Sequence, residues 1–537
     1  MKKIISLLLV FVLAFSCSAI AFAAEEPTPV IVVSGMGTAP LVDADSGENA
    51  FPPSNEVIIK NILKAAPSLA AAALLNDWTI FGQYGAKPVH DLFEKLKCDE
   101  NGDSVYNIVP TSYAGSADNY EDFKTDETTV TSERCVVRAV AEKIGWDRTY
   151  FFYYDFRRSA LDIADDLKAT IDEVLASTGS KKVSLIAMSF GGTITSAFLY
   201  KYGSDMLKNI VYASTAVGGT DIVGKLFSGN IEMEIDGIVD YLEEYLIKSG
   251  AAYELLGFGS DALTKYGAGA KTAINSYLKA MVEALREPVY AEVFVDTFVR
   301  FPGVWGLINA DYYDAAKEQM TAYAELSDSF IAKIDEYAYN VEMKLDELID
   351  EAESNGVNVY MIGAYGYAGI PLTGGVRNHT DNLIDTYLMT GYATVADYGT
   401  TLCADSYSRE KVCTDESHKH ISTDDVIDAS TCLLPERTWF IKNMSHVEYG
   451  RLQDSGKLLV WVATNEEGVD VHTDSRYPQF VSLNRNSGKC TSLTEGATVP
   501  ESGEEKQNVS FAERLDELFA LIIAFFRSVF FKVIPHN

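Results

Sequence analysis

The stretch IAMSFGG, residues 186–192, decides the fold prediction for this chain. It joins an apolar run over residues 183–188, typical of a buried strand, to a helical pattern over residues 193–200. A sharp strand-to-helix turn forces its central residue into an unfavourable backbone conformation, which only small neighbours tolerate. Alanine and glycine stand two positions before and after Ser189. The pattern therefore predicts that Ser189 is a nucleophile on such a turn. An ordinary serine in a glycine-rich bend is the alternative.

Strand and helix patterns alternate around this turn. Residues 29–33 (PVIVV) and 150–154 (YFFYY) are short apolar runs typical of buried strands, and the first leads into a glycine turn. A helix is expected to begin at Ser159, whose hydroxyl can accept the backbone N–H of Asp162. This alternation predicts an α/β fold, a mostly parallel sheet covered by helices on both faces.

The region from residue 219 to residue 352 has a different character. Long helical patterns replace the strand signal there, and the stretch is too long for a loop, so we expect a helical cap inserted into the sheet domain. Strand patterns resume at residues 358 (NVYMIG) and 438 (TWFI). The predicted organisation is a signal peptide at 1–23, a sheet domain at 24–218 and 353–470, the cap at 219–352, an irregular extension and polar linker at 471–510, and an amphipathic C-terminal helix at 511–537.

The two ends of the sequence indicate where in or outside the cell the protein is found. Lys2 and Lys3, an apolar stretch and Ala21-Phe22-Ala23 form the pattern of a cleaved signal peptide, so we expect an exported protein, secreted or held at the cell surface. Lipid attachment at Cys17 is the alternative. The C-terminal helix has an apolar run too short to span a bilayer, and its phenylalanines favour a peripheral membrane contact or a protein contact.

The net charge of the chain limits the kinds of partner that it can bind. The formal net charge is −33, and it becomes −35 without the two lysines of the signal peptide. Such a surface repels nucleic acid, so none is expected as a partner.

Six cysteines remain besides Cys17, an even number that permits up to three disulfides in an exported protein. Their spacing matches no zinc motif, so neither a metal nor another cofactor is predicted.

Three segments are similar to the lecithin:cholesterol acyltransferase-like branch of the α/β-hydrolases: PVIVVSGMG (29–37), FYYDFRRSALDIADDLKATIDEV (152–174) and VSLIAMSFGG (183–192). That branch has a P-V-[IL]-[LV]-V-P-G turn, then Y-D-[WF]-R, then a G-H-S-M-G-G type elbow. The resemblance covers residues 29–218 and 358–462, and it implies an α/β-hydrolase fold that acts on lipid or acyl-ester substrates. Ser34, Ala187 and Met188 stand where the family has proline, glycine and histidine.

A nucleophilic serine of this fold needs an acid and then a histidine later in the chain. His446 is preferred as the base because it follows the strand pattern TWFI after a short loop, where the resemblance places the family's histidine. His418 and His420 lie in a charged, cysteine-flanked segment and are expected to be solvated. For the acid, the resemblance favours Asp381, since DNLI from this residue matches the family's D-G-[TV]-V pattern. Asp385 is the competitor, and either aspartate could instead stabilise a turn or cap a helix.

The oxyanion of a tetrahedral intermediate needs two backbone donors. The N–H of Phe190, directly after the nucleophile, and the N–H of Met36, in the glycine turn after the first strand, are the candidates. Arg157, in the Asp155-Phe156-Arg157 stretch, is expected to pair with a carboxylate and to be structural.

Together these residues predict a secreted serine hydrolase that cleaves acyl esters through an acyl-enzyme. An acyltransferase with a lipid alcohol as acceptor, a peptidase or thioesterase, and a non-catalytic binding protein of the same fold are the alternatives. Aromatic side chains of the cap, Phe298, Phe301 and Trp305 among them, could form a groove for an acyl chain or could hold the cap helices together.

Overall fold

The computed structural model describes residues 26–75, 77, 79–125, 132–230, 290–370, 377–450, 453–484 and 487–493. The predicted signal peptide, residues 231–289 of the predicted cap, most of the predicted linker and the predicted C-terminal helix lie outside these residues. Within the described ranges, no helix combines the length and the apolar character needed to cross a bilayer.

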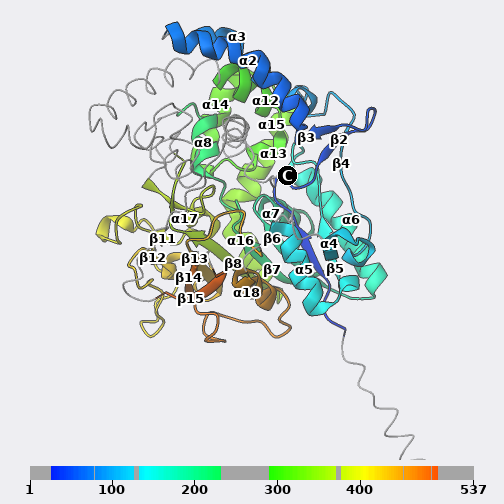
Figure 1. Ribbon diagram of the computed structural model, residues 1–537. Coiled ribbons are helices and arrows are strands. Elements are labelled where there is room, and N and C mark those ends of the chain that lie inside the picture. Colours follow the sequence, from blue (N-terminus) through cyan, green and yellow to red (C-terminus); the bar gives the residue numbers. More distant parts are fainter. Residues whose placement is uncertain are drawn as a thin grey trace, which may run out of the picture.

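An eight-stranded sheet forms the centre of the molecule (Figure 1). Its strands are β1 (Val30–Val33), β5 (Thr149–Phe152), β6 (Val183–Met188), β7 (Leu207–Ala213), β8 (Asn358–Tyr365), β13 (Thr438–Lys442), β14 (Phe480–Asn484) and β15 (Lys489–Ser492). They lie in the order β15-β14-β13-β8-β7-β6-β1-β5, and every neighbouring pair is parallel except β14 with β15. The predicted α/β fold is therefore confirmed.

Smaller elements complete the described chain. Three antiparallel sheets are formed by β2 (Leu41–Asp43), β3 (Asn49–Phe51) and β4 (Ile108–Pro110), by β9 (Tyr367–Ala368) and β10 (His379–Thr380), and by β11 (Thr394–Val395) and β12 (Ile427–Asp428). The helices are α2 (Asn55–Leu75), α3 (Thr79–His90), α4 (Asp122–Thr125), α5 (Ser132–Ile144), α6 (Ala160–Thr178), α7 (Gly191–Tyr202), α8 (Asp221–Phe227), the π-helical turn η4 (Tyr290–Val295), α12 (Asp296–Phe298), α13 (Pro302–Trp305), α14 (Tyr313–Tyr323), α15 (Asp328–Asn340), α16 (Leu345–Ser354), α17 (Thr386–Met389) and α18 (Gln453–Ala463).

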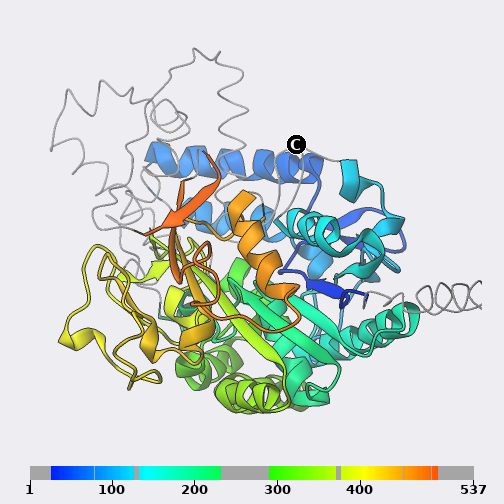
Figure 2. The ribbon, with the colours of Figure 1, turned by 90° about the horizontal axis from the view of Figure 1, so that it is seen from below.

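Both faces of the sheet are buried, because successive strand residues point into two different cores. Val30 and Val32 of β1 pack in the core shared with α5 and α18, whereas Ile31 and Val33 pack in the core shared with α6, α7 and α16. Figure 2 shows α18, in orange, on one side of the sheet and the green helices on the other. A continuous apolar strand such as VIVV is what a sheet covered on both faces requires.

The chain between β7 and β8 is largely helical where it is described. Trp305 of α13 and Tyr337 of α15 share a core with Phe198 of α7, and α16 contacts α7 and β8 directly, so it covers the sheet itself. Helices α2 and α3 belong to the stretch predicted as sheet domain, yet α3 contacts η4, which in turn contacts α12 and α14. The helical layer above the sheet is thus built from two separate insertions.

Arg157 pairs with a carboxylate, as predicted. Its guanidinium donates from Nε and Nη2 to the two carboxylate oxygens of Asp155, at 3.0 and 2.6 Å, and both side chains are buried. Ser159 caps α6, also as predicted, but its hydroxyl accepts the N–H of Leu161 at 3.3 Å instead of the N–H of Asp162. Either group belongs to the first turn, where backbone N–H groups lack partners within the helix.

The six cysteines all lie among the described residues, and none of them forms a disulfide there. The expected disulfides are therefore not formed among the described residues, and at least three of the thiols lie in different surroundings. Cys98 is buried in the core of α6 and α7, Cys432 is buried in a separate cluster around β12 and β13, and Cys403 is exposed. Burial raises the pKa of the Cys98 and Cys432 thiols to about 12, which keeps both thiols protonated and unreactive.

Gly191→Ala is expected to destabilise the fold by about 3 kcal/mol. A Cβ here would lie 2.4 Å from the carbonyl oxygen of Val33 and 2.9 Å from that of Ser34, on backbone that cannot shift without disturbing β1. The control is Gly456→Ala in α18, where the nearest atom, Cα of Gly450, would lie at 3.3 Å and the expected change is under about 1 kcal/mol. Urea denaturation measures the difference, and equal losses in the two variants would contradict the expected clash.

Candidate active site

Ser189 lies on the turn between β6 and α7, at the carboxyl end of its strand. Its φ is 53°, in the left-handed region that residues other than glycine rarely adopt. Its carbonyl oxygen accepts the N–H groups of Gly192 at 3.1 Å and Ala216 at 3.2 Å, which hold the turn in place. Because α7 begins at Gly191, the positive end of the helix dipole lies next to Ser189. The strained turn predicted from IAMSFGG is present in the structure.

His446 and Asp381 form a chain of hydrogen bonds with Ser189. His446 Nε2 lies 2.9 Å from Ser189 Oγ, and His446 Nδ1 lies 2.6 Å from Asp381 Oδ2. The backbone N–H of His446 also donates to the carbonyl oxygen of Asp381 at 2.8 Å, so the loop after β13 is tied to the segment that follows β10. The structure thus brings together the three side chains that the sequence selected, at the carboxyl end of the sheet, where ligands bind in α/β folds.

The Asp381 carboxylate sets the tautomer of His446. Its Oδ1 accepts the N–H groups of Leu383 at 3.0 Å and Ile384 at 2.7 Å, which leaves Oδ2 for the imidazole. Because a carboxylate only accepts hydrogen bonds, Nδ1 carries the ring proton and Nε2 presents its lone pair to the hydroxyl of Ser189. Asp381 is completely buried, so this orientation is protected from competing water.

The loop after β1 lies against the nucleophile. A Cβ on Gly35 would lie 3.0 Å from Ser189 Cβ and 3.4 Å from its Oγ, so a glycine is what lets the loop approach this closely. Met36, the candidate for the second oxyanion donor, is the next residue of this loop. Phe190, the other candidate, is the N-cap residue of α7, directly after Ser189.

Glu133 supports this loop, and no sequence pattern had singled it out. It is a buried residue of α5, and its Oε1 lies 3.0 Å from Thr38 Oγ1 and 3.3 Å from the position of a Gly35 Cβ. From the other side, the hydroxyl of Tyr154 donates to the carbonyl oxygen of Ser34 at 2.6 Å. A glutamate in the first turn of a helix is common, so only the folded chain reveals that Glu133 contacts the loop.

Asp385, the competing candidate for the acid, lies outside this hydrogen-bonded chain. Its carboxylate accepts from Asn378 Nδ2 at 2.7 Å and from the backbone N–H of Asp221 at 3.0 Å. Burial, with a smaller contribution from the charge of Asp221, raises the pKa of Asp385 to about 7. The carboxylate that faces His446 belongs to Asp381.

The raised pKa of Asp385 predicts a dependence of stability on pH. Between its ordinary pKa of 3.8 and its folded value of about 7, the folded protein keeps a proton that the unfolded chain has released. The stability that this proton gives is complete below the ordinary pKa and is lost as the pH rises through the folded value. The free energy of unfolding of Asp385→Asn, relative to the parent, should therefore rise between about pH 4 and about pH 7. Urea titrations across this range test it, and a constant difference would contradict it.

His420 is buried, contrary to the expectation that this segment is solvated. Its side chain is 3% exposed, and its Nδ1 lies 2.9 Å from Gln479 Oε1, while the His418 side chain is 35% exposed. The prediction was wrong because the segment folds back against β12 and against Glu436, which precedes β13. His379 is buried as well, and burial lowers its pKa to about 4.

The described cap aromatics are packed together. Phe301 and Trp305 are buried, the ring centroids of Phe298 and Phe301 lie 5.6 Å apart, and Trp305 Nε1 donates to the carbonyl oxygen of Val299 at 2.8 Å. Of the two predicted roles, an acyl-chain groove or packing between the cap helices, these side chains have the second, because their surfaces are buried against one another.

Comparison with known proteins adds little to this description. No protein-family model and no curated protein matches the chain. Seventeen chains of solved structures match, among them one from the crystal structure of the Tle4–Tli4 complex, with 13% identity and a TM-score of 0.27 over 64% of this chain and 75% of that chain. A similarity this weak carries no argument about the fold or the activity. It is the sheet order of this chain, with Ser189 on its strained turn, that fits an α/β-hydrolase-like fold.

Proposed function

We propose that this chain is a secreted serine hydrolase of the lipase or esterase type, which cleaves acyl esters of a lipid or another apolar substrate. The observation that carries the proposal is the hydrogen-bonded chain from Ser189 through His446 to Asp381, with spacings of 2.9 and 2.6 Å. A nucleophile, its base and the group that orients the base stand in their required order, within hydrogen-bond reach of one another.

The reaction would proceed in two steps. His446 Nε2 takes the proton of the Ser189 hydroxyl as Oγ attacks the ester carbonyl, and the buried Asp381 carboxylate stabilises the imidazolium that forms. The N–H groups of Met36 and Phe190 are proposed to bind the oxyanion of the tetrahedral intermediate. His446 then protonates the leaving alcohol, which leaves Ser189 acylated. Water, activated by the same histidine, attacks the acyl-enzyme and releases the acid.

The substrate class rests on the resemblance of residues 29–37, 152–174 and 183–192 to the lecithin:cholesterol acyltransferase-like branch. That branch acts on lipid esters, and some members pass the acyl group to an alcohol instead of water. Location outside the cell membrane rests on the signal-peptide pattern of residues 1–23. The predicted C-terminal helix, with its many phenylalanines, is proposed to hold the enzyme near a membrane or a protein partner.

A fluorophosphonate probe tests the proposal. It phosphonylates a serine only when a neighbouring base activates the hydroxyl, so we expect one adduct per chain, mapped to Ser189 by mass spectrometry. Failure of the folded protein to label would contradict a hydrolase and favour a non-catalytic binding protein. Nitrophenyl esters of increasing chain length and phospholipids then report the substrate preference, and added alcohols report whether transfer competes with hydrolysis.

A further inference from the structure

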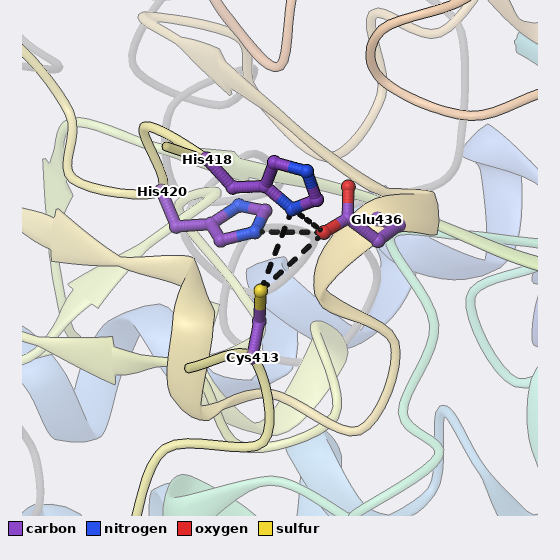
Figure 3. Close-up of side chains that lie close together, drawn as sticks. All are labelled: Cys413, His418, His420 and Glu436. Carbon is purple, nitrogen blue, oxygen red and sulfur yellow. Dashed lines mark hydrogen bonds and ion pairs between the residues drawn. The ribbon is translucent and has the colours of Figure 1, made fainter. Parts of the chain in front are cut away.

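Four side chains of types that bind transition metals gather far from Ser189 in the fold. They are Cys413, His418, His420 and Glu436, here called the Cys413 cluster (Figure 3). Each offers one ligand atom, and these atoms all lie within 4.8 Å of one another. We propose that the Cys413 cluster binds a zinc ion, and that this ion is structural. The proposal is independent of the hydrolase function.

Three of the spacings between ligand atoms are close to those of a tetrahedral zinc site. With usual Zn–N, Zn–O and Zn–S bonds, two ligand atoms lie about 3.3 Å apart, or about 3.5 Å apart when one is sulfur. Cys413 Sγ lies 3.6 Å from His418 Nδ1 and 3.5 Å from Glu436 Oε1, and His420 Nε2 lies 3.1 Å from the same oxygen. His418 Nδ1 lies closer to this oxygen, at 2.5 Å, so a bound ion would widen that pair by about 0.8 Å.

The surroundings point the correct nitrogen of His420 into the cluster. Gln479 donates from Nε2 to the carbonyl oxygens of Pro435 and Thr438, at 2.7 and 2.9 Å. Its Oε1 therefore faces His420 Nδ1, at 2.9 Å, and accepts the ring proton there. That leaves the lone pair of His420 Nε2 directed at Glu436. A hydrogen bond on the far nitrogen that fixes the tautomer is the usual arrangement around a metal-bound histidine.

The second oxygen of Glu436 is held from outside the cluster. His472 Nε2 lies 2.7 Å from Glu436 Oε2, so the carboxylate keeps Oε1 turned toward the other three ligand atoms. A thiolate and a carboxylate would together balance the two positive charges of zinc, with both imidazoles neutral. One sulfur, two nitrogens and one oxygen form a ligand set that suits zinc, whereas calcium and magnesium take oxygen ligands.

The position of the cluster indicates a structural role. Glu436 lies in the short helix Pro435–Arg437 directly before β13, and His446 follows that strand, so the cluster and the candidate active site lie at opposite ends of it, about 16 Å of strand apart. Cys413, His418 and His420 come from the long segment that connects β11 to β12. Four protein ligands leave no open position for a substrate, which is typical of structural zinc. The ion would fasten this segment to the start of β13.

Metal binding is tested on the whole protein after treatment with a chelator, with Zn²⁺ as the probe. We expect the protein to take up one zinc per chain, with a rise in the unfolding temperature. Co²⁺ in place of zinc should give a thiolate-to-cobalt charge-transfer band. Cys413→Ser should abolish that band and weaken zinc binding at least about 100-fold, because it removes a ligand. The control is Cys403→Ser, the same change at an exposed thiol of the same segment, which should keep both properties.

A second measurement needs no variant. In the unaltered protein, Zn²⁺ should protect Cys413 from alkylation by iodoacetamide and leave Cys403 reactive, as read by peptide mass spectrometry. Zinc uptake below one per chain, a cobalt band that survives in Cys413→Ser, or alkylation of Cys413 that Zn²⁺ does not slow would each overturn the proposal. None of these readouts uses hydrolytic activity, so the failure of one proposal leaves the other standing.

Discussion

Ser189→Ala is expected to lower kcat for a nitrophenyl ester about a million-fold, to a residual rate that owes nothing to covalent catalysis. The hydroxyl of Ser189 does not hold the turn in place. Its Oγ lies 2.9 Å from His446 Nε2, whereas the turn is held by hydrogen bonds to the backbone carbonyl oxygen of Ser189. Alanine would occupy the same left-handed conformation, so the variant should unfold at the same urea concentration as the parent. The loss of rate can then be assigned to chemistry.

The matched control is Ser196→Ala, a buried serine of α7, seven positions after Ser189, whose Oγ lies 3.3 Å from the hydroxyl of Tyr212. It should keep the activity within about threefold, since its loss removes only a weak hydrogen bond. The two rates are compared at saturating ester, together with fluorophosphonate labelling. If Ser189→Ala kept the rate and the label of the parent, the nucleophile would have to be sought elsewhere.

Asp381→Asn is expected to lower kcat about 10⁴-fold while leaving the fold intact. The backbone N–H groups of Leu383 and Ile384 need an acceptor, so the amide oxygen of the new side chain takes the place of Oδ1. Its NH₂ group is then left facing His446 Nδ1, which must accept. The ring proton moves to Nε2, and the imidazole can no longer take the proton of Ser189.

Asp385→Asn serves as the control for this change, because the same substitution four residues away touches neither His446 nor Ser189. Its activity is expected to stay within about tenfold of the parent, since its partners are Asn378 and Asp221. Steady-state kinetics at one pH measure kcat of Asp381→Asn and Asp385→Asn for comparison. A larger loss in Asp385→Asn than in Asp381→Asn would mean that the hydrogen bonds seen at Asp381 do not serve catalysis.

Much of the local structure could be predicted from the sequence, because it depends on neighbouring residues. A continuous apolar run such as residues 30–33 is typical of a strand that is buried on both faces. The small residues around Ser189 permit a strained turn that larger side chains would block. Neighbouring residues alone left both Asp381 and Asp385 open as the acid, and it was the resemblance of DNLI to the D-G-[TV]-V pattern that favoured Asp381. Asn382 stands at the glycine position of that pattern and adopts a φ of 78°, and the structure brings Asp381 into contact with His446.

The sequence by itself determined the α/β alternation, the strained turn and the short list of residues that the site could use, since each follows from side-chain size and periodicity along the chain. Only the tertiary structure decided which residues distant in sequence meet. It joined Asp381 to His446, brought Glu133 to the first loop, and gathered Cys413, His418, His420 and Glu436 from two segments. Such contacts arise when strands pair and loops pack at the sheet ends, and no spacing within one segment encodes them.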